Sequence, residues 1–126
     1  MDLSHVRAVA SLPVSDVQKA TDWYRDHLGV APSRSEEVGT EFSFGGGTSF
    51  FLYPSRFAGT NKATAMALNV EDFDGTIADL RARGVTFEEY DFDDLKTVDG
   101  VATNPDGTKS AWFKDPDGNI IGVGTM

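Results

Sequence analysis

The side chains that could carry out acid–base or metal chemistry are few and scattered along this sequence. It contains two histidines, His5 and His27, and no cysteine, so it offers neither a thiol nucleophile nor a thiolate metal site. Acidic residues cluster at positions 36–37, 88–89 and 91–94. Runs of like charge are typical of solvated loops rather than of acid–base pairs. The sequence has no glycine-rich phosphate loop and no nucleophile elbow.

The charge balance excludes some classes of partner. The formal net charge is −9, from 20 acidic and 11 basic residues. A surface of this sign repels phosphate backbones, so we expect no nucleic-acid partner, and it mildly favours a cationic ligand. No run approaches the roughly 18 apolar residues of a membrane helix, and the first residues do not resemble a signal peptide. We therefore expect no membrane partner and a cytoplasmic location.

The elements that must position these side chains repeat along the chain. Residues 12–29 and 68–84 both begin with Leu-x-Val-x-Asp and both continue into a segment with apolar residues at helical spacing. The aspartate of each motif suits a helix N-cap. The glycine that ends each segment suits the left-handed position after a helix. This layout is typical of a duplication.

After each predicted helix the pattern changes to short strands separated by turns. The predicted strands cover 31–37, 41–44 and 49–53 in the first half, and 86–90, 98–103, 109–114 and 119–124 in the second. Asn-Pro-Asp-Gly at 104–107 and Asp-Pro-Asp-Gly at 115–118 are typical turns.

We therefore predict an α+β fold made of two βαβββ repeats, which form a curved mixed sheet around a concave cup with the helices on the outer face. The repeats cover about residues 5–54 and 63–124, and a polar linker at 55–62 joins them. The whole chain, residues 1–126, is expected to form a single domain, because its length has room for one core.

Two motifs resemble those of a known family. The first is Leu-x-Val-x-Asp at 12–16 with Trp-Tyr-Arg-Asp-His-Leu-Gly at 23–29, and the second is Trp-Phe-Lys-Asp-Pro-Asp-Gly-Asn-Ile-Ile at 112–121. Taken with the repeat, the sequence resembles the vicinal-oxygen-chelate superfamily over residues 6–124. This superfamily contains glyoxalase I, extradiol dioxygenases, fosfomycin-resistance enzymes and bleomycin-binding proteins. The resemblance implies the two-repeat fold and a homodimer.

The metal-dependent members of this superfamily take their ligands from equivalent places in each half. The positions that correspond in this sequence are Val9, Ala65 and Gly122, with a fourth near residues 51–53. None of these side chains supplies the nitrogen, carboxylate or thiolate that a divalent cation needs. His5 does not replace them, because four residues along a strand separate it from Val9 by about 13 Å. The sequence therefore resembles a glyoxalase-like subgroup without the metal ligands, and we expect no metal and no cofactor.

Small side chains at these positions predict an open cup rather than a filled core. Strand alternation places neighbouring side chains on the same face, although it does not decide which aromatic rings point inward. We prefer Trp112 as a wall residue, because Phe113 then faces the helix, and a core or interface position for Trp112 stays open. The predicted ligand-binding residues are Arg7, Val9, Ser11, Phe44, Phe51, Tyr53, Ala65, Ala67, Asn69, Tyr90, Trp112 and Gly122.

The leading hypothesis for function is a metal-independent binding protein. Like the bleomycin-binding relatives, it would sequester an apolar or aromatic antibiotic or other secondary metabolite. This binding would confer drug resistance. On this hypothesis the chain is not an enzyme and has no catalytic residue.

Two alternatives stay open. The first is a glyoxalase-like isomerase or lyase that works without metal, with Glu41, Tyr53, Tyr90 and Asp91 as the candidate acids and bases. The second is an interaction module whose dimer interface is its function. An absence of pocket volume would favour the second.

Overall fold

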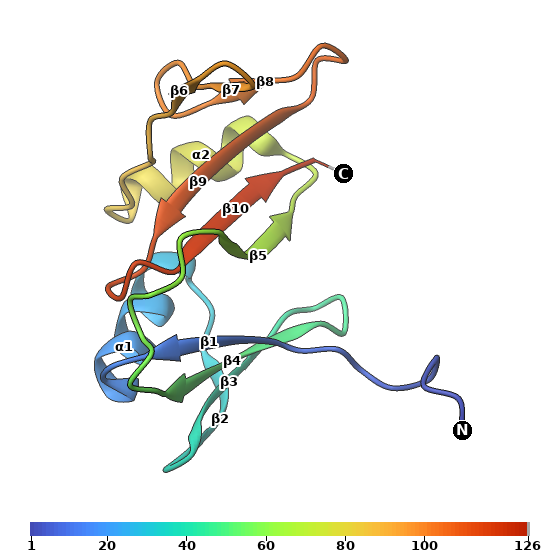
Figure 1. Cartoon of the computed structure of the whole chain (residues 1–126), viewed down its shortest axis with the longest axis vertical. Helices are drawn as coiled ribbons and strands as arrows, with labels where there is room; N and C mark the ends of the chain where they lie inside the picture. Colours follow the sequence, from blue (N-terminus) through green and yellow to red (C-terminus); the bar gives the residue numbers. More distant parts are fainter. Residues whose placement is uncertain (126) are drawn as a thin grey trace.

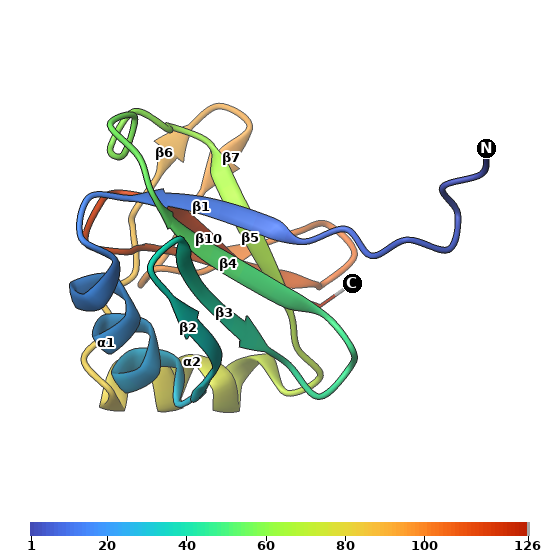
Figure 2. The ribbon, with the colours of Figure 1, turned by 90° about the horizontal axis from the view of Figure 1, so that it is seen from below.

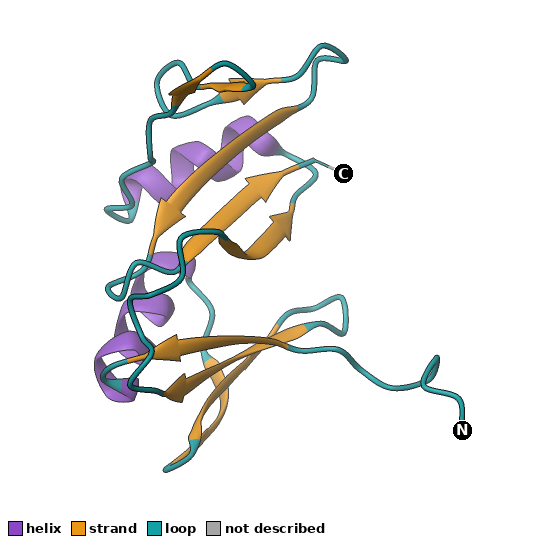
Figure 3. Ribbon diagram, viewed as in Figure 1, coloured by secondary structure: helices purple, strands orange, loops and turns teal. Residues whose placement is uncertain are grey.

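The chain folds into two four-stranded sheets, each covered by one helix (Figures 1 and 3). The computed structural model describes residues 1–125. In chain order the elements are β1 (Ala10–Val14), α1 (Val17–Leu28), β2 (Pro32–Glu36), β3 (Gly39–Ser43), β4 (Ser49–Pro54), β5 (Thr64–Asn69), α2 (Phe73–Ala82), β6 (Asp91–Phe92), β7 (Leu95–Lys96), β8 (Ala102–Thr103), β9 (Lys109–Lys114) and β10 (Ile120–Gly124). No helix within residues 1–125 is long and apolar enough to cross a membrane.

The two sheets have the same topology. The strand order is β1-β4-β3-β2 in the first sheet and β5-β10-β9-β8 in the second. In each sheet the first strand of the half runs parallel to the last, and the other neighbours are antiparallel. This correspondence confirms the predicted α+β fold of two βαβββ modules.

The second half differs from the prediction between its helix and β8. The predicted strand 86–90 is reduced to one bridge, between Phe87 and Phe113. A small hairpin, β6–β7, follows it, and β8 forms only at the end of the segment 98–103 that we predicted as a strand. Asp99 and Gly100 have φ angles of 52° and 77°, which are left-handed. A turn in this conformation cannot continue an extended strand, so the pairing begins only beyond it.

The helix ends form where the sequence predicts them. Asp16 and Asp72 each accept a hydrogen bond of 3.0 Å from the backbone N–H three residues further on, as N-caps do. Gly29 ends α1 in the left-handed conformation with φ of 69°. Each helix therefore lies against its sheet in a position set by its caps and its apolar face.

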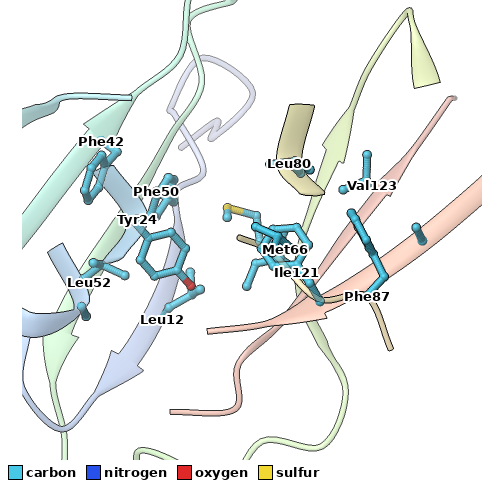
Figure 4. Close-up of a cluster of buried hydrophobic side chains, with 14 of the residues drawn as sticks. Leu12, Tyr24, Phe42, Phe50, Leu52, Met66, Leu80, Phe87, Ile121 and Val123 are labelled. Atoms are coloured by element: carbon cyan, nitrogen blue, oxygen red, sulfur yellow. The ribbon is translucent and has the colours of Figure 1, made fainter. Parts of the chain in front are cut away.

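The helix-facing sides of both sheets share one hydrophobic core (Figure 4). Alternate strand residues enter it, such as Leu12 and Phe50 from the first sheet and Ile121 and Val123 from the second. Tyr24 of α1 is fully buried among them. Because the covered faces meet in one core, the other face of each sheet is on the outside of the molecule. We call these two uncovered surfaces the open faces. Figure 2 shows the first sheet in a view turned by 90° from that of Figure 1, from below.

The turn between β9 and β10, residues 115–119, ties the two halves together, and we call it the clasp turn. Its hydrogen bonds to the first half run from Tyr24 Oη to Asp115 Oδ2 at 2.8 Å, from Asn119 Nδ2 to the Pro13 carbonyl at 2.9 Å, and from the Ser15 N–H to Asp117 Oδ1 at 3.1 Å. Asp115 is only 5% exposed. Burial first, and then the Asp115 carboxylate, raise the pKa of Tyr24 above that of a free phenol, so its hydroxyl stays a donor.

Candidate functional site

The open face of the second sheet carries three partly exposed aromatic rings, which we call the aromatic cluster. The ring centroids of Tyr90 and Trp112 are 5.6 Å apart at an interplanar angle of 72°, and Tyr90 stacks on Phe92 at 5.9 Å and 24°. Alternation along β9 produces this arrangement, because Phe113 is fully buried in the core and sends Trp112 to the opposite face. The cluster leaves aromatic surface available to a ligand.

A glycine on the neighbouring strand makes room for the indole ring. Gly122 of β10 is in register with Trp112 of β9. A Cβ atom added to Gly122 would lie 3.4 Å from both Cδ1 and Nε1 of Trp112. The indole therefore lies over the Gly122 backbone; a Cβ atom alone would be in ordinary contact with the ring, whereas a branched side chain such as valine would push it away from the sheet. Gly122, one of the predicted ligand-binding residues, therefore lies directly under the Trp112 ring.

A pocket of about 290 Å³ lies beside this cluster, and we call it the aromatic pocket. Its lining residues are Gly59, Asn61, Lys62, Tyr90, Phe92, Lys114, Gly118 and Ile120. Lys114 forms an ion pair with Glu88, with Nζ and Oε1 3.1 Å apart. Partial burial, helped by Glu88 and opposed by Lys114, raises the pKa of Tyr90. Its phenol therefore presents a proton to a ligand at neutral pH.

The open face of the first sheet carries a polar group beside apolar residues. Arg7 Nη2 donates a hydrogen bond of 2.6 Å to Ser49 Oγ, and the Ser49 hydroxyl donates one of 3.3 Å to Glu41 Oε2. Arg7 and Glu41 are 4.0 Å apart, and the Glu41 side chain is 21% exposed. A pocket of about 240 Å³ lies here, lined by Val9, Ser11, Arg34, Glu41 and Phe51. Tyr53, two residues after Phe51 on β4, is half-buried.

The remaining predicted residues lie elsewhere. Phe44 packs on Phe50 of the core, with ring centroids 5.7 Å apart, and so faces away from Phe51. With Ala67 and Asn69 it lines a third pocket, of about 570 Å³, between β5 and the turn that joins β3 to β4. Ala65 packs against the core.

One chain therefore does not bring all the predicted ligand-binding residues together. Tyr90, Trp112 and Gly122 lie together on the second open face, and Arg7, Val9, Ser11 and Phe51 lie on the first. The predicted cup has its two walls on different outer surfaces of one chain.

Two lysines of the aromatic pocket were not among the ligand-binding residues predicted from the sequence. Lys114 could have been found, because it is two residues after Trp112 and alternation puts both on one face of β9. Lys62 lies in the linker before β5, where no periodicity indicates direction. Within residues 1–125, no three His, Cys, Asp or Glu side chains lie close enough together to hold a metal ion.

The comparison with protein families gives a match over nearly the whole chain. A family model described as the glyoxalase/bleomycin resistance protein/dioxygenase superfamily matches residues 3–123. Among proteins with curated descriptions, none matches this sequence.

Solved structures of similar fold cover nearly the whole chain. A glyoxalase/bleomycin resistance protein from Catenulispora acidiphila is 25% identical with a TM-score of 0.71, over 96% of this chain and 98% of the other. A superfamily member from Sphaerobacter thermophilus is 26% identical with a TM-score of 0.68, over the same shares. A lactoylglutathione lyase from Agrobacterium tumefaciens is 18% identical with a TM-score of 0.71, and the alignment covers 97% of this chain and 93% of the other. This match shows a likeness of fold only.

Proposed function

Because the chain belongs to the glyoxalase/bleomycin resistance protein/dioxygenase superfamily, we propose that it binds a small aromatic or apolar molecule and sequesters it unchanged. The observation that carries the proposal is the aromatic cluster of Tyr90, Phe92 and Trp112 beside the aromatic pocket. Apolar concave sites with a few polar groups are typical of small-molecule binding. An antibiotic or other secondary metabolite is the candidate ligand, and binding it would confer drug resistance.

The geometry of the cluster suits a planar ligand. Tyr90 and Trp112 meet edge to face, so together they offer an L-shaped aromatic surface, of which Tyr90 also lines the pocket. An aromatic contact of this kind contributes about 0.5–1.5 kcal/mol beyond the area it buries. Phe92 is 58% exposed, so a ligand that covers it gains further apolar burial.

We also propose that the protein works as a homodimer. The two open faces of one chain point outward, so a closed cup needs the first open face of one copy to lie against the second open face of another. Light scattering on the purified protein at several concentrations tests this, because a monomer at all concentrations contradicts it. The cytoplasmic location and the absence of nucleic-acid and membrane partners stay predictions.

Metal-free acid–base catalysis is the second candidate, and Glu41 is the residue that favours it. Its partly buried carboxylate sits next to Phe51 on an open face and is held by Ser49. A general base needs such a position within reach of a substrate proton. Of the other predicted acids and bases, Asp91 is exposed and lies 3.9 Å from Lys96, and the raised pKa of Tyr90 makes its phenol a poor base.

Native mass spectrometry distinguishes the two candidates. The purified protein is incubated with a panel of aromatic antibiotics and with the methylglyoxal–glutathione adduct. Sequestration predicts that a compound of unchanged mass remains bound and is released intact on unfolding. Release of a compound of altered mass contradicts sequestration and supports the enzyme.

A further inference from the structure

We infer that the aromatic pocket selects an aromatic molecule with a negatively charged group, and that Lys62 recognises the charge. The inference rests on the proposed function, because it concerns the same pocket and adds the chemical class of the ligand. The juxtaposition that carries it is two lysines and two aromatic residues in the lining of one pocket.

The charge of this pocket is opposite to that of the chain. The protein has 20 acidic and 11 basic residues, yet the lining of the aromatic pocket contains Lys62 and Lys114 and no carboxylate. Glu88 pairs with Lys114 from outside this lining. A local cationic site on an acidic protein selects an anion at short range, where screening by salt is weakest.

The two lysines are not equivalent. The charge of Lys114 is partly offset by Glu88 at 3.1 Å. Lys62 is exposed, and within residues 1–125 it has no ion pair, so its ammonium group is available to a ligand. It comes from the linker, whereas the hairpin region contributes Tyr90 and Phe92 to the same pocket. A ligand that stacks on the rings can therefore extend a carboxylate or sulfonate to Lys62.

The size of the pocket limits the ligand. A volume of about 290 Å³ is at the small end of ligand pockets, which begin near 300 Å³. One or two fused rings with a single acid group suit this space. The Tyr90 phenol, which stays protonated, can donate a further hydrogen bond to the acid group.

The test compares two probes of nearly the same shape, 2-naphthoate and 2-naphthamide, by titration calorimetry at low ionic strength. The wild-type protein is expected to bind naphthoate more tightly than naphthamide. Lys62→Gln should lower the affinity for naphthoate about two- to fivefold, the range for an exposed ion pair, and leave the affinity for naphthamide unchanged. Lys62→Arg should restore the preference for naphthoate.

A matched control separates local from overall charge. Lys109→Gln removes the same charge at the opposite end of β9, where Lys109 pairs with Asp74 at 3.0 Å. It should leave both affinities as in the wild type.

The outcomes separate this inference from the proposed function. Equal binding of the two probes, or an equal loss of both in Lys62→Gln, overturns the selection of anions and leaves aromatic binding intact. Failure of both probes to bind overturns the inference and also counts against the proposed function at this pocket.

Discussion

Replacing Tyr24 with phenylalanine should destabilise the fold through the clasp turn alone. The substitution keeps the buried ring and removes the hydroxyl that donates to Asp115 at 2.8 Å. Asp115 Oδ2 also accepts a hydrogen bond from Asn119 Nδ2. Asp115 Oδ1 accepts hydrogen bonds from the backbone N–H groups of Asp117 and Asn119. One of four donors to this carboxylate is therefore lost.

The expected loss follows from the burial of the pair. A hydrogen bond to a charged group contributes about 1.5–3 kcal/mol. Tyr24 is 0% exposed and Asp115 is 5% exposed, so water does not readily replace the missing donor. We expect Tyr24→Phe to lower the free energy of unfolding by about 2 kcal/mol. At this chain length that corresponds to a fall in Tm of about 6–12 °C.

Urea unfolding followed by far-ultraviolet circular dichroism measures this difference. The matched control is Tyr53→Phe, because Tyr53 is half-buried on the first open face and its hydroxyl has no hydrogen-bond partner within residues 1–125. The control should stay within about 0.5 kcal/mol of the wild type, as surface substitutions do. A similar small change in Tyr24→Phe would refute the role given to the clasp turn.

Three further predictions concern the aromatic cluster and the pH dependence of stability. Trp112→Ala should weaken binding of an aromatic ligand by about 1–3 kcal/mol in titration calorimetry, whereas Phe57→Ala, an exposed ring outside the aromatic pocket, should not. Gly122→Val should weaken the same binding because it displaces the indole ring; unchanged Trp112 fluorescence would contradict this. Folding raises the pKa of Tyr24, so the contribution of this phenol to stability is complete below its unfolded-state pKa of about 10 and is lost as the pH rises above it. Above about pH 10 the free energy of unfolding should therefore fall more steeply with pH in the wild type than in Tyr24→Phe. Equal pH dependence in the two proteins would exclude this linkage.

The features predicted best from the sequence depend on neighbouring residues. Helix ends follow from Asp16 and Gly29, because caps are local hydrogen-bonded structures. The direction of Trp112 follows from alternation once Phe113 is placed in the core. The strand at 98–103 was overestimated, because its apolar residues do not show that a left-handed turn at Asp99 and Gly100 delays the pairing until Ala102.

The features that escaped prediction depend on contacts far apart in the chain. The Asp-Pro-Asp-Gly segment is visible as a turn, but its partner Tyr24 is 91 residues away, and no local pattern links them. Phe44 was assigned to the cup because the phase of β3 had no anchor in the sequence. In the structure Phe42 is buried, and alternation then sends Phe44 toward the core. The division of the predicted cup over two outer surfaces likewise depends on how the halves pack.

The clasp turn also has a consequence for synthesis on the ribosome. Tyr24 is translated 91 residues before its acceptor Asp115, an interval on the order of 5–20 s at ordinary elongation rates. A first half that emerged alone during this time would lack the apolar side chains of the second half that complete the shared core, and the Tyr24 hydroxyl would lack its acceptor. The nascent first half should therefore stay loosely packed, with its apolar strands accessible to chaperones, until the last strand pair leaves the exit tunnel.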